Sequence, residues 1–594
     1  MLDLRVYRAA FVPAVVALFV AAFSLADRPA PATTADPAEV FDAAGAFGDE
    51  TRPQRNSLHE LARAFPDRRP GSAGDAGLAA RVAETLGQSG AYRVTRTRTN
   101  GLETVVAVRP GLSSRRIVVL AGRDARARPG LAELSATAAL LEIARVYRER
   151  DLNRTLVLVS TSGTTTGFAP SRAWARQAAN APVDAVLVLG DMAGARVRKP
   201  WVVPWSTSSP PAPLALQRTV EAALRAKVDR NVGGSRASGQ WVRRALPLTL
   251  SGQGVVNAQG LPAVFVGASG ERGPAPGEPV SRARLGAFGR GVLRAIIAID
   301  HARPAGDRSP FAARAGGLVV QRNVLPDWAV RMLVGALLLP ALLAALDAWF
   351  RARRRRLPAG RWAAWVATAA APVVLVWLWL RVLGLTGAVE VPDAPVAPEV
   401  FPPGTAGVVA LASAAVVAAV GWFGVRPLLL RRTAVSGNPA AGGLAAATGL
   451  LTNGVAAAAW MFNPYAAALL LPAAHLWLLA AAPGSRMRRG TTALAVAAGL
   501  ALPVLAVAHY ARALGLGPLD LAWLGGMVFA NGHVSLPAAL ATALWLAALS
   551  GVVTAVRARR RVEAAVPPQP LRTRGPRNYA GPGSLGGTES ALRR

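Results

Sequence analysis

The sequence contains no cysteine, which excludes disulfide bonds and thiolate metal sites. Lysine is nearly absent as well: of the 67 basic residues only Lys199 and Lys227 are lysines, so 67 − 2 = 65 are arginines. Together with the abundant alanine and glycine, this bias indicates a GC-rich genome rather than a selected basic patch. No stretch interleaves basic residues with aromatic ones, so the net charge of +34 does not predict nucleic-acid binding. We expect no nucleic-acid partner.

Charged residues are also scarce: they make up 17% of the sequence, whereas hydrophobic residues make up 52%. This composition is apolar for a soluble protein. The first apolar run covers residues 9–26 and is close to the length that spans a bilayer. We predict an uncleaved N-terminal anchor there. A cleaved signal peptide is the alternative, because Ser24-Leu25-Ala26 resembles a cleavage site.

Seven further apolar runs are predicted to span a membrane. They cover residues 329–350, 362–385, 406–425, 442–462, 465–482, 491–511 and 536–556. Every second connection is rich in arginine, most clearly at 351–356, whereas the connection after 385 carries only acidic charges. Since cytoplasmic connections carry the excess of arginine, the pattern predicts eight spans in the plasma membrane with both termini cytoplasmic. The shorter apolar stretch 521–532 is expected to be re-entrant or interfacial.

Between the first two runs, strand-like segments alternate with amphipathic helical ones from residue 56 onward. This alternation predicts a three-layer α/β domain with a mostly parallel sheet, on the extracytoplasmic side. Chemistry in such sheets lies at the carboxyl ends of the strands. The loops to inspect are therefore 122–134, 162–167, 190–194 and 267–279.

Four motifs in this domain carry a resemblance to a known family. They are Arg69-Pro70-Gly71-Ser72, the helical run 135–145, the segment 163–174 with Gly163, Gly167 and Ser171-Arg172-Ala173-Trp174, and Asp191-Met192-Ala193-Gly194. On the basis of these motifs, residues 56–301 resemble the di-zinc aminopeptidases of metallopeptidase family twenty-eight. The resemblance implies a zinc-exopeptidase-like fold, five ligands on two zinc ions and a glutamate base that activates a bridging water.

Residue by residue, the resemblance implies that most of this set is lost. The first histidine falls on Gly122, the bridging aspartate on Ala132, and the base and its neighbouring glutamate on Thr164 and Thr165. Asp191 survives, while the last histidine is missing from residues 264–284. A threonine hydroxyl is far too weakly basic to replace a glutamate base. We therefore expect no catalytic residue and no cofactor, with zinc bound only if the family's activity survives.

Three carboxylates remain near these loops, namely Asp124, Glu133 and Asp191. They could form a displaced metal site, which would suit calcium or magnesium better than zinc. The favoured alternative is that Asp124 and Asp191 cap loops and helix starts, as loop aspartates commonly do.

Within the apolar runs, His475 and Asn453 are the polar residues of most interest. His475 could pair with Asn453 across a hairpin, and we favour packing over a substrate path.

The resulting domain organisation is an N-terminal transmembrane anchor (1–28), a linker (29–55), an exported aminopeptidase-like domain (56–305), a second linker (306–328), a seven-span region (329–557) and a disordered basic cytoplasmic tail (558–594). We expect a pseudoenzyme that acts as a binding or scaffold module, with membrane lipids and peptide or protein partners. Two alternatives remain: an active membrane-bound aminopeptidase with relocated ligands, and a transporter or envelope-assembly protein that acts through its spans.

Overall fold

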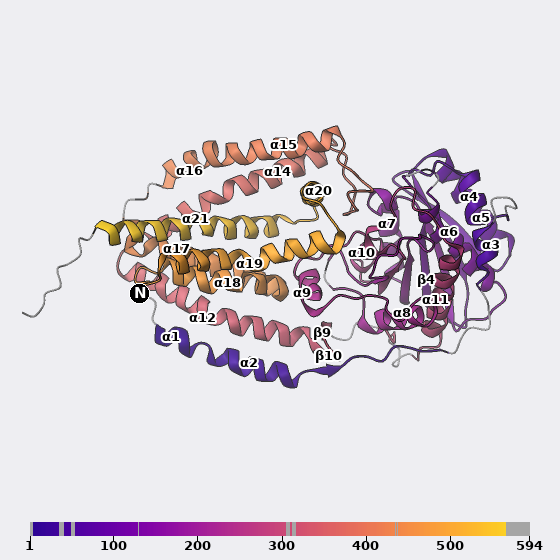
Figure 1. Ribbon diagram of the computed structural model, residues 1–594, viewed down its shortest axis with the longest axis horizontal. Coiled ribbons are helices and arrows are strands. Elements are labelled where there is room, and N and C mark those ends of the chain that lie inside the picture. The colour runs from indigo at the N-terminus through magenta and orange to yellow at the C-terminus, as the bar shows by residue number, and fades with distance from the viewer. Residues whose placement is uncertain are drawn as a thin grey trace, which may run out of the picture.

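The computed structural model describes residues 4–34, 41–48, 54–126, 128, 130–208, 210–303, 309–311, 316–433, 435 and 438–565. An α/β domain and a bundle of long helices lie end to end (Figure 1). The predicted cytoplasmic tail lies mostly outside the described residues.

A seven-stranded sheet forms the centre of the α/β domain. Its strand order is β2 (Arg93–Thr99), β3 (Leu102–Arg109), β5 (Arg154–Thr161), β4 (Ser113–Gly122), β6 (Val183–Leu189), β8 (Ala263–Val266) and β7 (Val202–Val203). The central strands β5, β4, β6 and β8 are parallel, whereas β2, β3 and β7 pair antiparallel. The sheet is therefore mixed, and the predicted parallel arrangement is confined to its four central strands. A physical reason is the two-residue turn Asn100-Gly101, in which both residues have positive φ, because such a turn can only join antiparallel strands.

Helices cover both faces of this sheet. One face packs against α4 (Leu58–Ala64), α5 (Ala73–Gln88), α6 (Leu131–Val146), α8 (Leu214–Lys227) and α11 (Arg282–Asp300). The other face packs against α7 (Ala169–Ala178) and α10 (Gln253–Asn257). β5 is buried along its whole length, as expected for a central strand covered on both sides.

The core under α7 and α10 continues into the helical bundle. Phe168 and Trp174 of the α/β domain belong to the same buried cluster as Tyr510, Trp523 and Met527 of the bundle. The two parts therefore share a hydrophobic core. Between them lies α9 (Ala237–Ala245) (Figure 1).

The expected linkers contain regular structure where they are described. Residues 29–55 include the short helix α3 (Ala43–Phe47). Residues 306–328 include β9 (Gly317–Val320) and β10 (Asn323–Pro326), which form a small antiparallel sheet with β1 (Ala26–Asp27).

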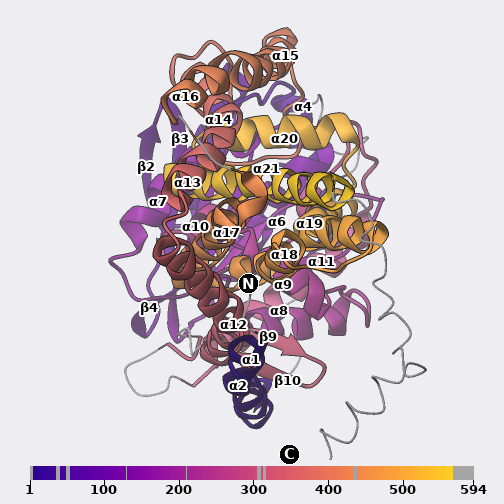
Figure 2. The same ribbon diagram turned by 90° about the vertical axis from the view of Figure 1, so that its left-hand side faces the viewer.

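Seven helices among the described residues are long and apolar enough to cross a membrane. They are Asp327–Arg354 (α12), Ala359–Leu385 (α13 and α14, Ala359–Ala367 and Ala371–Leu385), Thr405–Thr433 (α15 and α16, Thr405–Val420 and Arg426–Thr433), Gly443–Phe462 (α17), Pro464–Ala481 (α18), Arg489–Leu514 (α19) and Leu536–Val562 within α21 (Leu536–Ala565). Figure 2 shows them nearly end-on, with α15 and α16 at one edge of the bundle.

The eighth predicted span is not among them. The N-terminal run forms α1 (Leu4–Ala9) and α2 (Val12–Phe23), and its apolar part Tyr7–Phe23 is shorter than the other seven helices. The two helices are separated just before Pro13, which has no backbone N–H to continue the helical ladder. α2 runs beside α12 in both views (Figures 1 and 2). The stretch expected to be re-entrant or interfacial forms the 13-residue helix α20 (Pro518–Ala530).

Candidate functional site

Asp124 follows the carboxyl end of β4 and is 2% exposed. Its Oδ1 accepts hydrogen bonds from the backbone N (3.0 Å) and the Oγ1 (2.8 Å) of Thr164. Its Oδ2 accepts hydrogen bonds from the backbone N (2.9 Å) and the Oγ1 (2.8 Å) of Thr165. Both carboxylate oxygens are thus engaged by the short helix Thr164–Thr166, which occupies the loop after β5. Thr164 and Thr165, where the sequence resemblance implies glutamates, are hydrogen-bond donors to Asp124.

Gly122 is the last residue of β4, and Thr164 lies against it. A Cβ atom built on Gly122 would lie 2.5 Å from Thr164 Cγ2, too close for two carbon atoms. The space that a side chain at position 122 would need is filled by the Thr164 methyl group.

Asp191 follows β6 and is 3% exposed. Its Oδ1 accepts hydrogen bonds from the backbone N of Ala193 (2.9 Å) and Gly194 (2.7 Å), and its Oδ2 accepts one from the Ser269 hydroxyl. The Ser135 hydroxyl lies 3.4 Å from Oδ1. Burial raises the pKa of the Asp191 carboxyl.

Glu133 lies in the first turn of α6, next to the buried Ala132. Burial raises its pKa to about 7, with further contributions from the negative charges of Asp191 and Asp124, while Arg68 acts in the opposite direction. Glu133 is therefore within electrostatic reach of both other predicted carboxyls. Among the described residues, no three His, Cys, Asp or Glu side chains form a group that could hold a metal ion.

The domain's two histidines lie elsewhere. His59 is in α4 and makes an edge-to-face contact with Phe47, with 4.9 Å between ring centroids. His301 follows α11, and its Nδ1 lies 2.9 Å from the Ile297 carbonyl oxygen.

The two polar residues singled out in the bundle do not pair. His475 Nδ1 lies 2.7 Å from the Tyr7 hydroxyl and its Nε2 lies 2.9 Å from the Leu337 carbonyl oxygen. Asn453 Nδ2 donates to the carbonyl oxygens of Gly449 (3.0 Å) and Ala474 (3.4 Å). The contact that the sequence allowed across the hairpin is not formed, because His475 faces α1 and α12 instead. Both side chains join helices to each other.

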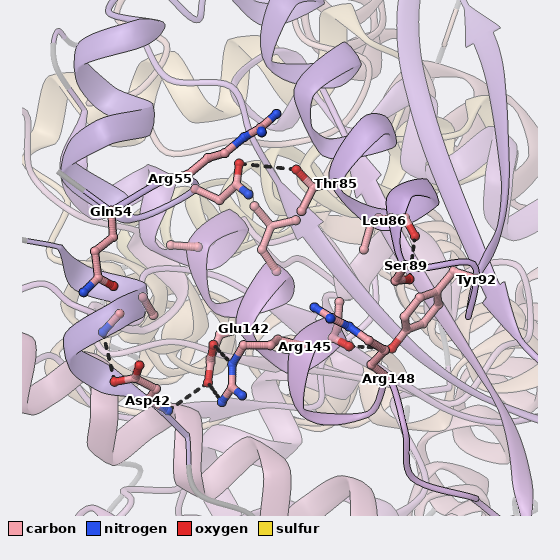
Figure 3. Close-up of a pocket in the computed structure, with 16 residues that line it drawn as sticks. Asp42, Gln54, Arg55, Thr85, Leu86, Ser89, Tyr92, Glu142, Arg145 and Arg148 are labelled. Atoms are coloured by element: carbon pink, nitrogen blue, oxygen red, sulfur yellow. Dashed lines mark hydrogen bonds and ion pairs between the residues drawn. The ribbon is translucent and has the colours of Figure 1, made fainter.

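A pocket of about 220 Å³ lies away from these loops, among α3, α5 and α6 (Figure 3). Glu142 and Arg145 form a two-pronged ion pair in its wall, with distances of 2.7 and 2.8 Å. Asp42 donates its backbone N–H to Glu142 at 2.8 Å. None of the predicted site residues lines this pocket.

Sequence reasoning missed the connection between α14 and α15, which lies against the loops at the carboxyl ends of the strands. Arg272, in the loop after β8, forms an ion pair with Glu399 of this connection. The sequence showed that this connection is acidic and that the domain loops contain arginines. It did not show that Arg272 pairs with Glu399, because the two residues are more than a hundred positions apart.

No protein-family profile matches the chain, and no curated protein sequence matches it. Solved structures of similar shape include the LapA aminopeptidase of Legionella pneumophila, at 14% identity and a TM-score of 0.35, covering 41% of this chain and 70% of that one. A leucine aminopeptidase precursor of Bacteroides thetaiotaomicron has 13% identity and a TM-score of 0.31, covering 44% and 99%. A glutaminyl cyclase of the same organism has 14% identity and a TM-score of 0.33, covering 44% and 98%. These likenesses extend over less than half of this chain and carry no argument about its chemistry.

Proposed function

We propose that this chain is a multi-pass membrane protein whose α/β domain is a binding or scaffold module on a zinc-exopeptidase-like fold, without peptidase activity. The observation that carries the proposal is the set of four hydrogen bonds between Asp124 and the threonine pair. In the family that the sequence resembles, a metal-binding histidine lies two residues before this aspartate, and a glutamate base stands at the position of Thr164.

The chemistry of these groups argues against hydrolysis. A metal ion on Asp124 would have to displace hydrogen bonds from two backbone N–H groups and two hydroxyls, which would then be left without their acceptor. The threonine hydroxyls donate to a carboxylate and offer no base of suitable pKa for a water molecule. At position 122, the Thr164 methyl group occupies the space of a first ligand.

The membrane placement that we propose follows the arginine pattern. Seven long apolar helices support a membrane protein. With the arginine-rich ends of the helices on the cytoplasmic side, the α/β domain lies outside the cytoplasm. Its partners there would be peptides or proteins, and the bundle would contact lipids.

The test is a metal and activity measurement on the purified full-length protein in detergent. We expect less than stoichiometric zinc after incubation with zinc and dialysis, and no chelator-sensitive release of aminoacyl amides. An Asp191→Asn variant serves as the matched control, since it removes the one ligand that survives. Stoichiometric zinc that disappears in this variant, together with hydrolysis that a chelator stops, would overturn the proposal.

A second candidate, an aminopeptidase with relocated groups, is favoured by one observation. A carboxyl with a pKa of about 7, as in Glu133, is suited to act as a general base at neutral pH. Any hydrolysis found should then fall by at least about a hundredfold in Glu133→Gln. Hydrolysis that is unchanged in Glu133→Gln would exclude this candidate.

A further inference from the structure

Residues 391–401, here named the strap, lie in the connection between α14 and α15 and run along three loops of the α/β domain. These loops follow β4, β5 and β8, at the carboxyl ends of strands that run parallel in the centre of the sheet. Open α/β sheets bind their ligands at this edge. In this chain, a segment of the helical bundle occupies it (Figure 1).

The loop after β5 and the Arg172 guanidinium of α7 bind the backbone of the strap. The Asp393 N–H donates to the Thr166 carbonyl oxygen at 3.1 Å, and Arg172 donates to the Asp393 carbonyl oxygen at 2.9 Å. Gly167, with φ of +104°, lies beneath them: a Cβ there would come within 2.3 Å of the Asp393 nitrogen. Glycine at this position allows the two backbones to approach each other.

The other two loops each supply an arginine. Arg126, after β4, donates to the Val400 carbonyl oxygen at 2.9 Å, and its guanidinium lies 5.2 Å from the centre of the Phe401 ring. Arg272, after β8, holds the Glu399 carboxylate with both prongs of its guanidinium, with Nε at 2.8 Å from Oε2. Such two-pronged contacts fix orientation as well as charge.

The strap itself has the features of a peptide ligand. Ala394, Val396, Ala397 and Phe401 are only 2–6% exposed. Pro392, Pro395 and Pro398 recur at every third position, which favours an extended chain without internal hydrogen bonds. The strap turns after Ala397, whose carbonyl oxygen accepts hydrogen bonds from the Val400 and Phe401 N–H groups at 2.9 and 3.0 Å. Such a segment loses little conformational freedom on binding. On its other side, Trp523 of α20 donates to the Phe401 carbonyl oxygen at 2.7 Å.

We infer that the loops after β4, β5 and β8 form a peptide-binding surface for acidic, proline-spaced segments, and that the strap is its built-in ligand. This inference rests on the proposed function, because it names the ligand class of a binding module. While the strap is in place, a second peptide of the same kind is excluded. The surface becomes available when the strap leaves it.

The test uses the full-length protein with residues 391–401 replaced by a Gly/Ser segment of equal length. The probe is a fluorescent synthetic peptide with the sequence of residues 391–401, followed by fluorescence anisotropy. We expect saturable binding to the replaced chain and none to the natural chain. A Glu399→Lys peptide should bind at least about fivefold more weakly, because it opposes Arg272. An Asp393→Asn peptide is the matched control and should bind within about twofold, since position 393 contributes backbone atoms. Absence of binding by a folded replaced chain, or equal binding of the Glu399→Lys peptide, overturns the inference.

A second measurement decides the matter if the replaced chain does not fold. Gly167→Ala in the otherwise natural chain should increase hydrogen exchange at the Asp393 and Ala394 amides by about tenfold. Gly260→Ala is the matched control, because Gly260 also has a positive φ, of +82°, but nothing within 4 Å of its Cβ position. Equal exchange in both variants contradicts the inference. Neither measurement involves zinc. If the peptide does not bind, the proposed lack of hydrolysis is unaffected. If zinc-dependent hydrolysis is found, the peptide-binding result is unaffected.

Discussion

Gly122 and Thr164 lie so close that a Cβ on the glycine would approach the threonine methyl carbon to 2.5 Å. At these positions the sequence resemblance implies a metal-binding histidine and its general base. The two substitutions are therefore coupled through space. Once a threonine stands at 164 in this conformation, only glycine fits at 122 without movement of one of them.

This relationship predicts a double-mutant result. Gly122→Ala should lower the free energy of unfolding by about 1–3 kcal/mol through overpacking. Thr164→Ser removes the offending methyl group and keeps the hydroxyl that donates to Asp124. The double variant should therefore regain at least about 1 kcal/mol relative to Gly122→Ala. Denaturant titration of the purified protein measures both values, and additive losses would show that the contact does not set the residue at 122.

Asp124 should matter for stability. In Asp124→Ala, two backbone N–H groups and two hydroxyls lose their buried acceptor, so the free energy of unfolding should fall by about 2–4 kcal/mol. Asp151→Ala is the control, because its carboxylate is 93% exposed in a weak ion pair of 3.7 Å, and should change stability by less than about 0.5 kcal/mol. Equal losses of unfolding free energy in the two variants would mean that the Asp124 carboxylate does not stabilise the threonine loop.

Glu133 should give the fold a pH dependence of a particular sign. Its pKa rises from 4.5 to about 7 on folding, so the folded chain binds this proton more tightly than the unfolded chain. The contribution of Glu133 to stability is therefore complete below pH 4.5 and is lost as the pH rises through 7. The rise corresponds to about 3 kcal/mol. Glu133→Gln should remove this slope, whereas Glu149→Gln, at an exposed position, should keep it. Unfolding titrations at pH 5 and pH 8 measure the difference, and an unchanged slope in Glu133→Gln would contradict the assignment.

The ion pair Arg243–Glu271 should be important where the two parts of the molecule meet. Both side chains are 5% exposed, their closest distance is 2.7 Å, and the Arg243 guanidinium lies 4.8 Å from the Tyr510 ring centre. Removing one partner leaves a buried charge, so Glu271→Gln should cost about 3–5 kcal/mol. Glu84→Gln breaks the exposed pair Arg55–Glu84, whose side chains are 60% and 48% exposed, and should cost less than about 1 kcal/mol. Thermal unfolding of both variants in detergent provides the comparison, and similar midpoints would argue against a structural role for the buried pair.

Much of this architecture follows from local sequence patterns. The strand β8 coincides with the apolar run at residues 263–266, and the middle of β5 coincides with the apolar run at residues 156–159. Burial on both faces makes such strands continuously apolar, which a sequence displays directly. The seven long apolar helices are likewise visible from the lengths of the runs. The sequence alone also shows which residues fall at the ligand positions that the resemblance implies.

Tertiary structure decided the rest. The sequence did not show that Asp124 would hold both threonines, that His475 would face Tyr7 rather than Asn453, or that the strap would reach the strand ends. The N-terminal run is apolar enough to be taken for a span, yet it forms two short helices separated before Pro13. Hydrophobic periodicity records how deeply a residue is buried and on which face. It does not show which residue, distant in the sequence, a given side chain contacts, because that depends on how all the elements pack together.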